Sequence, residues 1–298
     1  MDEIADGVHA YLQESAGWCV NNAGVLLDAG RGPVVVDTAA TEARARRLGA
    51  AVRELAAAPP RLLVNTHFHG DHTFGNALVG EPDTLVVAHE RARQEMAAAG
   101  LGLTGLWPGV GWGAVELRLP DVTYDGRLEL HLARRTVRLL HPGPAHTTGD
   151  TLVWLPEDRV LFAGDVVMPG CTPFILMGSL HGSLRTLEYL RTLAPRVIVG
   201  GHGPVCGPEA IDETEGYLRW LLRTAEGALA AGLAPLEAAR QLGTHPYQQW
   251  TDPERLVGNL HRAYAELRGG AYGEPLDVVG IFGEMVEFNG GRLPACYA

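Results

Sequence analysis

Residues 67–72 (His-Phe-His-Gly-Asp-His) place four side chains that can bind a metal ion within six positions. Imidazole nitrogens and carboxylate oxygens are the ligands that zinc takes in catalytic sites, where one coordination position stays open for water. Three more candidates lie in short Gly-rich contexts downstream: His146, Asp165 and His202. Seven such residues at four predicted strand ends indicate a two-metal hydrolytic centre.

The spacing of these residues predicts two ligand groups. His67 and His69 lie two positions apart and can chelate one ion from the same side, while Gly70 lets the backbone bend so that the next pair faces a second ion. Two ions about 3.5–4 Å apart can share a hydroxide and polarise a carbonyl. The first ion would take His67, His69 and His146, the second would take Asp71, His72 and His202, and Asp165 would bridge them.

The joint pattern carries this prediction, because a single His or Asp after a strand is more often a cap or turn residue. His181, in the loop after Asp165, is the one further histidine expected near the site. The remaining histidines lack a ligand-like context and are expected at the surface or at helix caps: His9, His89, His131, His141, His245 and His261.

Strand-like and helix-like segments alternate through the first two thirds of the chain. The strand-like segments are residues 8–13, 18–27, 33–37, 62–65, 85–88, 122–124, 128–132, 136–141, 151–155, 160–162 and 197–199. The helix-like segments are residues 41–57, 89–99 and 183–193, followed by only helices at 209–231, 235–242 and 253–267. This order predicts an α/β fold with two mixed sheets covered by helices in residues 1–208, and a C-terminal helical extension, residues 209–298, packed on it.

Composition and charge narrow the function classes. The net charge of the 298 residues is −11, which disfavours nucleic acid and anionic membrane surfaces as partners. All 24 basic residues are Arg, so Lys nucleophiles and Schiff bases are excluded. The four cysteines form no CxxC pair, and neither a signal peptide nor a membrane span is visible, which together predict a cytoplasmic protein with reduced thiols. The sequence leaves the oligomeric state open.

The ligand pattern resembles the metallo-β-lactamase superfamily over about residues 8–207. The resemblance implies an αββα sandwich with two Zn²⁺ at one edge of the two sheets and a hydroxide nucleophile held by them. It also implies the ligand roles given above, with Asp71 and Asp165 as the catalytic carboxylates.

This chain differs from several subfamilies at particular residues, and these differences make some subfamilies less suitable than others. Zinc β-lactamases lack a carboxylate at the position of Asp165, and flavo-diiron proteins carry Glu where this chain has His69. Enzymes of the glyoxalase II type share the ligand set but bind glutathione with basic residues of a helical tail, and the tail here has Arg but no Lys. Nuclease members carry a basic surface, which the net charge of −11 contradicts.

Segments at residues 17–24, 36–42, 143–148, 201–208 and 256–264 are similar to a narrower group, the cyclase/thioesterases of aromatic polyketide pathways. This similarity implies a polyketide substrate bound to an acyl carrier protein, with ring-closing aldol condensation or thioester hydrolysis. One alternative is a general dizinc hydrolase of a small thioester, lactone or β-lactam. Another is a non-catalytic protein that keeps the fold in order to dock a carrier protein.

Bulky apolar residues in predicted loops are candidates for a substrate pocket, because such pockets are mostly apolar with a few polar groups. Cys171 lies in one of these loops but lacks the paired base that a nucleophile needs. The substrate-binding candidates are Phe68, Trp18, Trp107, Trp112, Phe174 and Met177, with His181 beside them.

Overall fold

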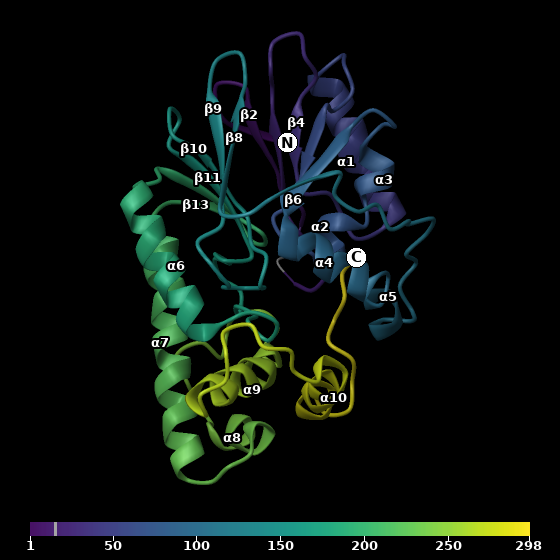
Figure 1. Ribbon diagram of the computed structural model, residues 1–298. Coiled ribbons are helices and arrows are strands. Elements are labelled where there is room, and N and C mark those ends of the chain that lie inside the picture. Colours follow the sequence, from purple (N-terminus) through teal and green to yellow (C-terminus); the bar gives the residue numbers. More distant parts are fainter. Residues whose placement is uncertain (15–16) are drawn as a thin grey trace.

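The computed structural model describes residues 1–14 and 17–298. Two β-sheets lie face to face with helices on their outer faces (Figure 1). Between the sheets lies an apolar cluster that includes the buried residues Val8, Leu26, Val64, Leu139 and Phe162. Alternate residues of each strand thus fill the interior, as in other packed sheets. The α/β fold class predicted above, two mixed sheets flanked by helices, is confirmed.

The first sheet has seven strands in the order of the sequence. Its first four strands pair antiparallel and the last four pair parallel, β4 belonging to both sets. Its strands are β1 (Asp2–Ala5), β2 (Val8–Tyr11), β3 (Ala23–Leu26), β4 (Val34–Val36), β5 (Leu62–Val64), β6 (Leu85–His89) and β7 (Val122–Tyr124).

The second sheet has six strands in the order β13-β12-β11-β10-β9-β8. All neighbours pair antiparallel except β11 and β12, which run parallel, so the carboxyl ends of these two strands meet at one edge. The strands are β8 (Arg127–His131), β9 (Thr136–Leu140), β10 (Leu152–Leu155), β11 (Val160–Gly164), β12 (Val197–Gly200) and β13 (Val205–Cys206).

Helices begin where the sequence supplies caps. Thr41 caps the first helix, its hydroxyl accepting from Arg44 N at 3.4 Å, and Ser179 caps α6 by accepting from Gly182 N at 2.9 Å. The helices up to residue 193 are α1 (Glu42–Leu55), α2 (Gly70–Thr73), α3 (Asn76–Val79), α4 (Glu90–Ala99), α5 (Leu103–Leu106) and α6 (Leu180–Leu193). The later helices are α7 (Glu209–Ala230), α8 (Pro235–Gln241), α9 (Arg255–Leu267) and α10 (Val278–Phe288).

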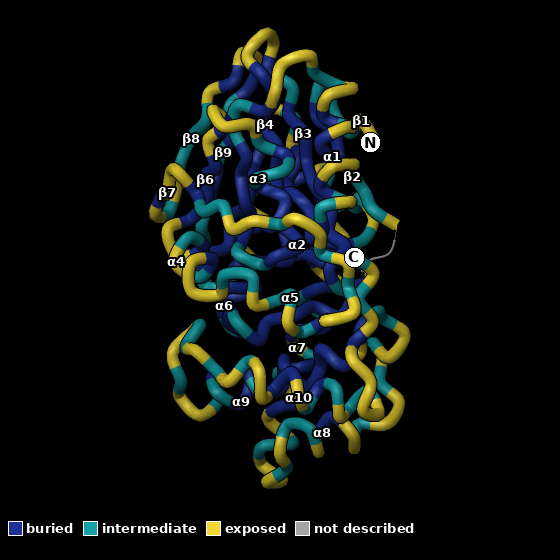
Figure 2. Tube along the Cα trace, turned by 90° about the vertical axis from the view of Figure 1, so that its right-hand side faces the viewer, coloured by how far each residue is buried: buried dark blue, intermediate teal, exposed yellow. Residues whose placement is uncertain are grey.

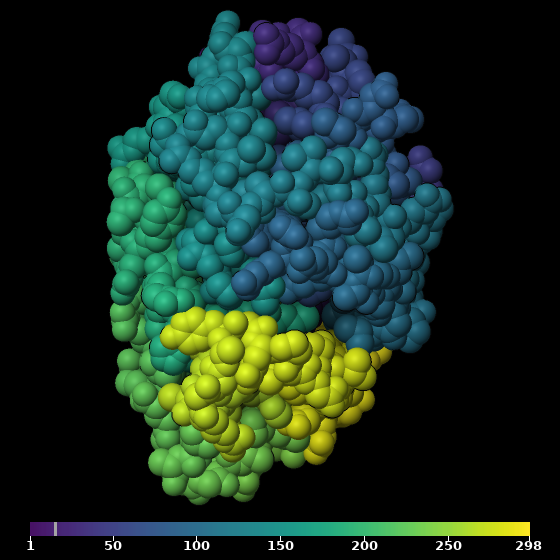
Figure 3. Space-filling model, in the orientation of Figure 1, coloured from purple at the N-terminus to yellow at the C-terminus, as the bar shows by residue number. Residues whose placement is uncertain are grey.

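The C-terminal helices share a core with the second sheet. One apolar cluster joins Leu161 of β11 and Leu187 of α6 to Leu218 of α7, Leu260 of α9 and Met285 of α10. Buried positions therefore continue from the sheets into these helices (Figure 2). In the space-filling view the last residues of the chain, in yellow, lie directly below the teal and blue part of the molecule, with green residues at the lower end (Figure 3).

Several elements differ from the sequence prediction. The strand expected at residues 18–27 is shorter, since β3 covers only Ala23–Leu26. Strands β1 and β13 and helix α10 were not predicted, because the two strands are short and largely unburied and α10 lacks a wide polar face. The loop expected at residues 100–120 contains the short helix α5. Within residues 1–14 and 17–298, no helix is long and apolar enough to cross a membrane.

Candidate metal centre

All seven predicted ligands lie in segments that follow strands, either in a loop or in the short helix α2. His67 follows β5, and the chain then turns into α2, where His69 is the N-terminal cap and Asp71 and His72 are in the helix. His146 follows β9. Asp165 and His202 come directly after β11 and β12, whose parallel pairing brings their carboxyl ends together. The sandwich thus collects residues that are up to 135 positions apart in the sequence at one edge.

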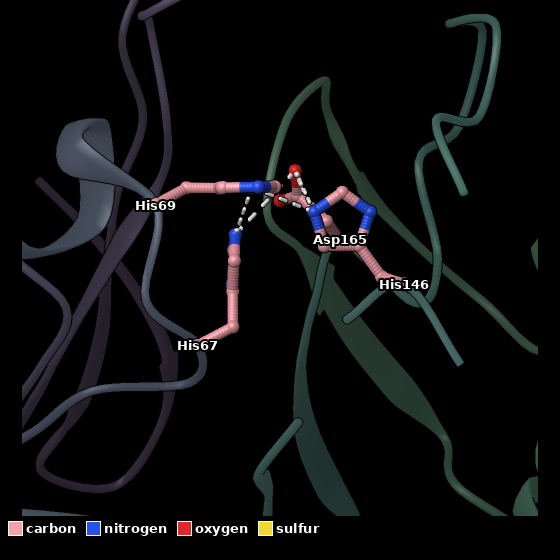
Figure 4. Close-up of side chains that lie close together, drawn as sticks. All are labelled: His67, His69, His146 and Asp165. Atoms are coloured by element: carbon pink, nitrogen blue, oxygen red, sulfur yellow. Dashed lines mark hydrogen bonds and ion pairs between the residues drawn. The ribbon is translucent and has the colours of Figure 1, made fainter. Parts of the chain in front are cut away.

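Two groups of ligand atoms form there. The side chains of the first group point toward one another (Figure 4). Within each group the ligand atoms lie within 4.8 Å of one another. Asp165 also reaches the second group, because its carboxylate lies 3.2 Å from His72 Nε2 and 3.4 Å from His202 Nε2. The groups are His67, His69, His146 and Asp165, and Asp71, His72 and His202.

In the first group, imidazole lone pairs face a common point. His69 Nδ1 lies 3.0 Å from His67 Nε2 and 2.9 Å from His146 Nε2. The outer nitrogen of His146 donates to the carbonyl of Phe174, which can only accept. The outer nitrogen of His67 lies 3.0 Å from the Thr66 hydroxyl. Since His146 carries its proton on Nδ1, its Nε2 presents a lone pair to the centre of the group.

In the second group, a buried carboxylate outside the motif orients a ligand. Asp37 Oδ2 lies 2.8 Å from His72 Nδ1 and accepts from the Thr66 hydroxyl at 2.7 Å, while its Oδ1 accepts from Thr66 N at 2.7 Å. Because the Thr66 proton goes to Asp37, the Thr66 oxygen accepts from His67. One carboxylate therefore fixes the proton positions of His72 directly and of His67 through Thr66, as outer-shell carboxylates do at metal sites.

Unpartnered buried atoms test whether these residues fit a metal. His72 Nε2 and Asp165 Oδ1 lie 3.2 Å apart, yet neither has a hydrogen-bond partner among the described residues. Buried polar groups are normally satisfied, and leaving one unsatisfied costs about 1–3 kcal/mol. A divalent cation between them would satisfy both. The donor set of imidazole and carboxylate also suits zinc, so the residues fit the predicted ions.

Two glycines permit the close packing of the centre. Gly70 begins α2, where the chain turns after His69, and does so without a positive φ. A Cβ there would lie 2.4 Å from the ring of Phe74, so glycine avoids a Cβ clash at this turn. At Gly201 a Cβ would lie 1.8 Å from Asp165 Oδ1. Any side chain at position 201 would therefore displace the carboxylate that joins the two groups.

Within the first ligand group the protein environment sets charges that suit cation binding. Burial lowers the pKa of His69 to about 4 and the pKa of His146 to about 3, so both imidazoles are neutral at pH 7. Burial would raise the pKa of Asp165, but the surrounding imidazoles, His202 first, hold that pKa well below its ordinary value. Neutral imidazole and ionised carboxylate are the protonation states that a metal requires. In the second group burial, which would lower the pKa of His72, is outweighed by the carboxylates of Asp37, Asp165 and Asp71, which hold that pKa well above its ordinary value.

A cavity of about 610 Å³, open solvent included, lies over the metal ligands. Of the predicted pocket residues, Trp18, Trp107, Phe174 and Met177 line it. C-terminal residues complete the wall, with Arg255 from α9 and Val278 and Phe282 from α10.

The other predicted pocket residues are not among those that line this cavity. The ring of Phe68 lies beside that of His69, tilted by 54° with ring centroids 4.6 Å apart, and Trp112 packs edge-on against Phe74. His181 Nδ1 lies 2.7 Å from Glu266. Cys171 is buried, and burial raises the pKa of its thiol to about 12, in agreement with the view that it is no nucleophile.

The aromatic walls turn their polar atoms away from the cavity. Trp18 Nε1 donates to Glu254 at 2.7 Å, and Trp107 Nε1 donates to the carbonyl of Pro294 at 2.8 Å. The Arg255 guanidinium lies 4.2 Å from the centre of a Trp18 ring, with its charge balanced by Asp252 at 2.8 Å. The cavity thus presents aromatic and aliphatic surface next to the metal ligands, a combination that suits an apolar substrate.

Sequence reasoning missed the residues that orient the ligands. Asp37 ends a predicted strand, and its φ of 60° is a backbone conformation that residues other than glycine rarely adopt. A carboxylate at a strand end was the available signal, although it did not identify a partner. Asp150, which accepts from Thr147 N and from the Thr147 hydroxyl at 2.6 Å, holds the His146 loop in the same way.

Comparison with known proteins identifies a family that this chain matches and several relatives of similar sequence. The profile of the Metallo-beta-lactamase superfamily matches residues 16–202, more than half of the chain. The chain is 31% identical to hydroxyacylglutathione hydrolase of Anaeromyxobacter dehalogenans, over 68% of this chain and 69% of that protein. It is also 31% identical to acyl-coenzyme A thioesterase MBLAC2 of Bos taurus, over 50% of this chain and 59% of that protein.

Two other relatives are longer proteins. The match to this chain spans 57% of the length of one of them and 42% of the length of the other. Among solved structures, the DIM-1 metallo-beta-lactamase matches with a TM-score of 0.60 at 18% identity, covering 74% of this chain and 96% of that one. At this identity the structural likeness shows the fold alone.

Proposed function

The chain belongs to the metallo-β-lactamase superfamily of hydrolases, and from this premise we propose that it hydrolyses a thioester with an apolar acyl group, using two Zn²⁺. The observation that carries the proposal is the position of the two ligand groups below a cavity with aromatic and aliphatic walls. A hydroxyacylglutathione hydrolase and an acyl-coenzyme A thioesterase among the relatives support the thioester. In this proposal residues 1–208 form the catalytic domain and residues 209–298 a helical extension packed on it.

The residues take defined roles in this proposal. His67, His69 and His146 would hold one ion, Asp71, His72 and His202 the other, and Asp165 would bridge them. When bound, such ions lower the pKa of water and polarise a carbonyl.

Asp71 and Asp165 are the two carboxylates that line the cavity, and in this proposal they would take a proton from the attacking water. Trp18 and Phe174, whose ring centroids lie 5.1 Å apart, would bind the acyl group and exclude bulk water from the reacting carbonyl. The leaving group needs little help, because a thiol with a pKa of about 8.5 departs readily as the thiolate and then takes up a proton from water.

The test is a substrate panel on the zinc-loaded protein. An aromatic acyl-coenzyme A is expected to be hydrolysed with a higher kcat/KM than acetyl-coenzyme A, a hydroxyacylglutathione, a lactone or a β-lactam. Asp71→Ala should abolish the activity. His261→Ala should not, because it removes a half-buried histidine of α9 that pairs with Glu284 of α10 and does not line the cavity. Equal rates for β-lactam and thioester, or no thioester turnover by the metal-loaded protein, would refute the proposal.

A narrower function, polyketide cyclase/thioesterase, is favoured by one observation, the aromatic character of the cavity walls. Besides Trp18 and Phe174, Trp107 and Phe282 line the cavity, with their ring centroids 5.3 Å apart. Incubation with a bicyclic aromatic thioester tests this function, because ring closure and release of the free acid give different products. The relatives named above lend it no support, so the polyketide substrate, the acyl carrier protein partner and the cytoplasmic location stay predictions.

A further inference from the structure

Helix α9 carries a row of buried polar residues on one face. Their spacing of four, three and four positions places them along a single side of the helix. Each is at most 8% exposed, although polar side chains are rarely buried without a partner. The row consists of Arg255, Asn259, Arg262 and Glu266.

Each residue of this row has a hydrogen-bond partner in one backbone segment, residues 172–181, part of which contacts the metal centre. Arg255 donates to Thr172 O at 3.0 Å, and Arg262 donates to Leu176 O at 2.8 Å. Glu266 accepts from Leu180 N at 2.8 Å. A helix some 80 residues further along the chain therefore satisfies the backbone of a segment that forms one wall of the cavity.

Asn259 holds the part of this segment that touches a metal ligand. Its Oδ1 accepts from Ile175 N at 2.9 Å, and its Nδ2 donates to Pro173 O at 2.7 Å. Between these two residues lies Phe174, whose carbonyl accepts the Nδ1 proton of His146. One amide thus fixes the peptide unit that contains the Phe174 carbonyl, through Ile175 N, and the preceding peptide unit, through Pro173 O. That carbonyl sets the tautomer and orientation of His146.

The packing around this amide leaves little freedom for another arrangement. Asn259 is fully buried, and a Cβ on the adjacent Gly258 would lie 2.9 Å from the ring of Phe174. Tyr217 of α7 adds a third contact, its hydroxyl oxygen lying 2.8 Å from Asn259 Nδ2. The Phe174 carbonyl is therefore held by the C-terminal helices and not by the strands that carry the ligands.

We propose that Asn259 is a positioning residue for the metal ligand His146, acting through the backbone of residues 173–175. This inference rests on the proposed metal centre but not on the identity of the substrate. Outer residues that orient metal-binding histidines typically change metal affinity or activity by about 10- to 100-fold. Because Asn259 acts through one peptide unit, we expect an effect near the lower end, about 10-fold.

The test compares metal binding in three variants of the full chain with the wild type. Asn259→Ala removes both backbone hydrogen bonds, and Asn259→Ser keeps a hydroxyl for one of them. Tyr217→Phe is the matched control, because it removes a contact to the same amide but leaves both bonds to the segment. Zinc affinity is measured by competition with a chromophoric chelator, and the ligand field is recorded from the visible spectrum of the cobalt-loaded protein.

We expect Asn259→Ala to lower the affinity for one ion about 10-fold and to alter the cobalt spectrum, with Asn259→Ser in between and Tyr217→Phe like the wild type. If Asn259→Ala does not fold, Asn259→Ser carries the comparison. The inference is overturned if the folded variants lose stability toward urea but keep wild-type zinc affinity and spectrum. A wild-type protein that binds two ions but cleaves no thioester would refute the proposed function and leave this inference intact.

Discussion

Asp37 Oδ2 lies 2.8 Å from His72 Nδ1, and both side chains are buried at the edge where the sheets meet the ligand loops. The carboxylate holds the proton of His72 on the outer nitrogen, so Nε2 faces Asp165. The same oxygen accepts from Thr66, through which it reaches His67. A residue outside both ligand groups is thereby in contact with each of them.

Replacement of this carboxylate should weaken metal binding. Asp37→Asn places an amide where two donors converge, so we expect the zinc affinity to fall about 10- to 100-fold. The matched control is Asp28→Asn, which changes a buried carboxylate that pairs with Arg61 at 2.9 Å, away from the ligands. Chelator competition on both variants measures the effect. Equal zinc affinities for the two variants would show that Asp37 has no special role.

Removal of metal should lower both stability and activity. A ligand present at 100 times its Kd stabilises the folded state by about 2.7 kcal/mol, so chelation should lower the melting temperature by several degrees. Zinc added back should restore both the melting temperature and thioester hydrolysis. The metal-centre assignment fails if exhaustively chelated protein, shown by elemental analysis to hold no transition metal, retains full turnover.

The buried carboxyl group of Glu95 should make the free energy of unfolding depend on pH. Burial raises its pKa to about 7 from an ordinary value of 4.5, and its Oε2 has no hydrogen-bond partner among the described residues. The folded state binds the proton of the Glu95 carboxyl group more tightly than the unfolded state does. The protonated group therefore contributes its full share to the free energy of unfolding below pH 4.5, and this share is lost as the pH rises through 7.

Glu95→Gln should therefore be more stable than the wild type at pH 8, by about 1–3 kcal/mol, and similar to it near pH 4.5–5. Urea unfolding of the metal-loaded proteins at pH 5 and pH 8 measures the difference. Glu90→Gln, at an exposed position of the same helix, is the control and should show the same small difference at both pH values. A Glu95→Gln difference that does not change with pH would contradict the prediction.

Phe282 should select for substrates with a bulky acyl group. Its ring lines the cavity and packs edge-on against Trp107, so Phe282→Ala removes apolar surface from one wall. We expect KM for an aromatic acyl thioester to rise about 10-fold, since the lost contact is worth about 1–3 kcal/mol, with little change for an acetyl thioester. Val279→Ala, on the same helix but 74% exposed, is the control. A uniform loss with both substrates would indicate a structural effect instead.

The grouping of the seven candidate ligands could be predicted because each of them lies in a short local motif after a strand-like segment. Their assignment to two ions stays a prediction. His67, His69, Asp71 and His72 lie within six positions, and the parallel pairing of β11 with β12 brings Asp165 and His202 to them. The α/β class followed from the alternation of strand-like and helix-like segments. Both inferences use patterns that can be recognised from residues close together in the sequence.

The supporting residues could not be predicted, because their partners are set by tertiary packing. Nothing within ten positions of Asn259 shows that its amide meets residues 173 and 175. Spacing does show that Arg255, Asn259, Arg262 and Glu266 share one helix face, yet a polar stripe usually faces water. Here it faces a backbone segment whose amides and carbonyls need partners. Similarly, loop position alone did not separate Trp107, which lines the cavity, from Trp112, which does not.

The two indoles in the cavity wall give this protein an optical signal of its own. Trp18 and Trp107 have ring centroids 5.5 Å apart, and both border the space that a substrate would fill. Trp107 is only 4% exposed, so an acyl chain entering that space would replace water chiefly around the partly exposed Trp18, and the emission maximum of the protein should move to shorter wavelength on binding. Ligand occupancy could then be followed without a label or a turnover assay, even in variants that no longer perform chemistry.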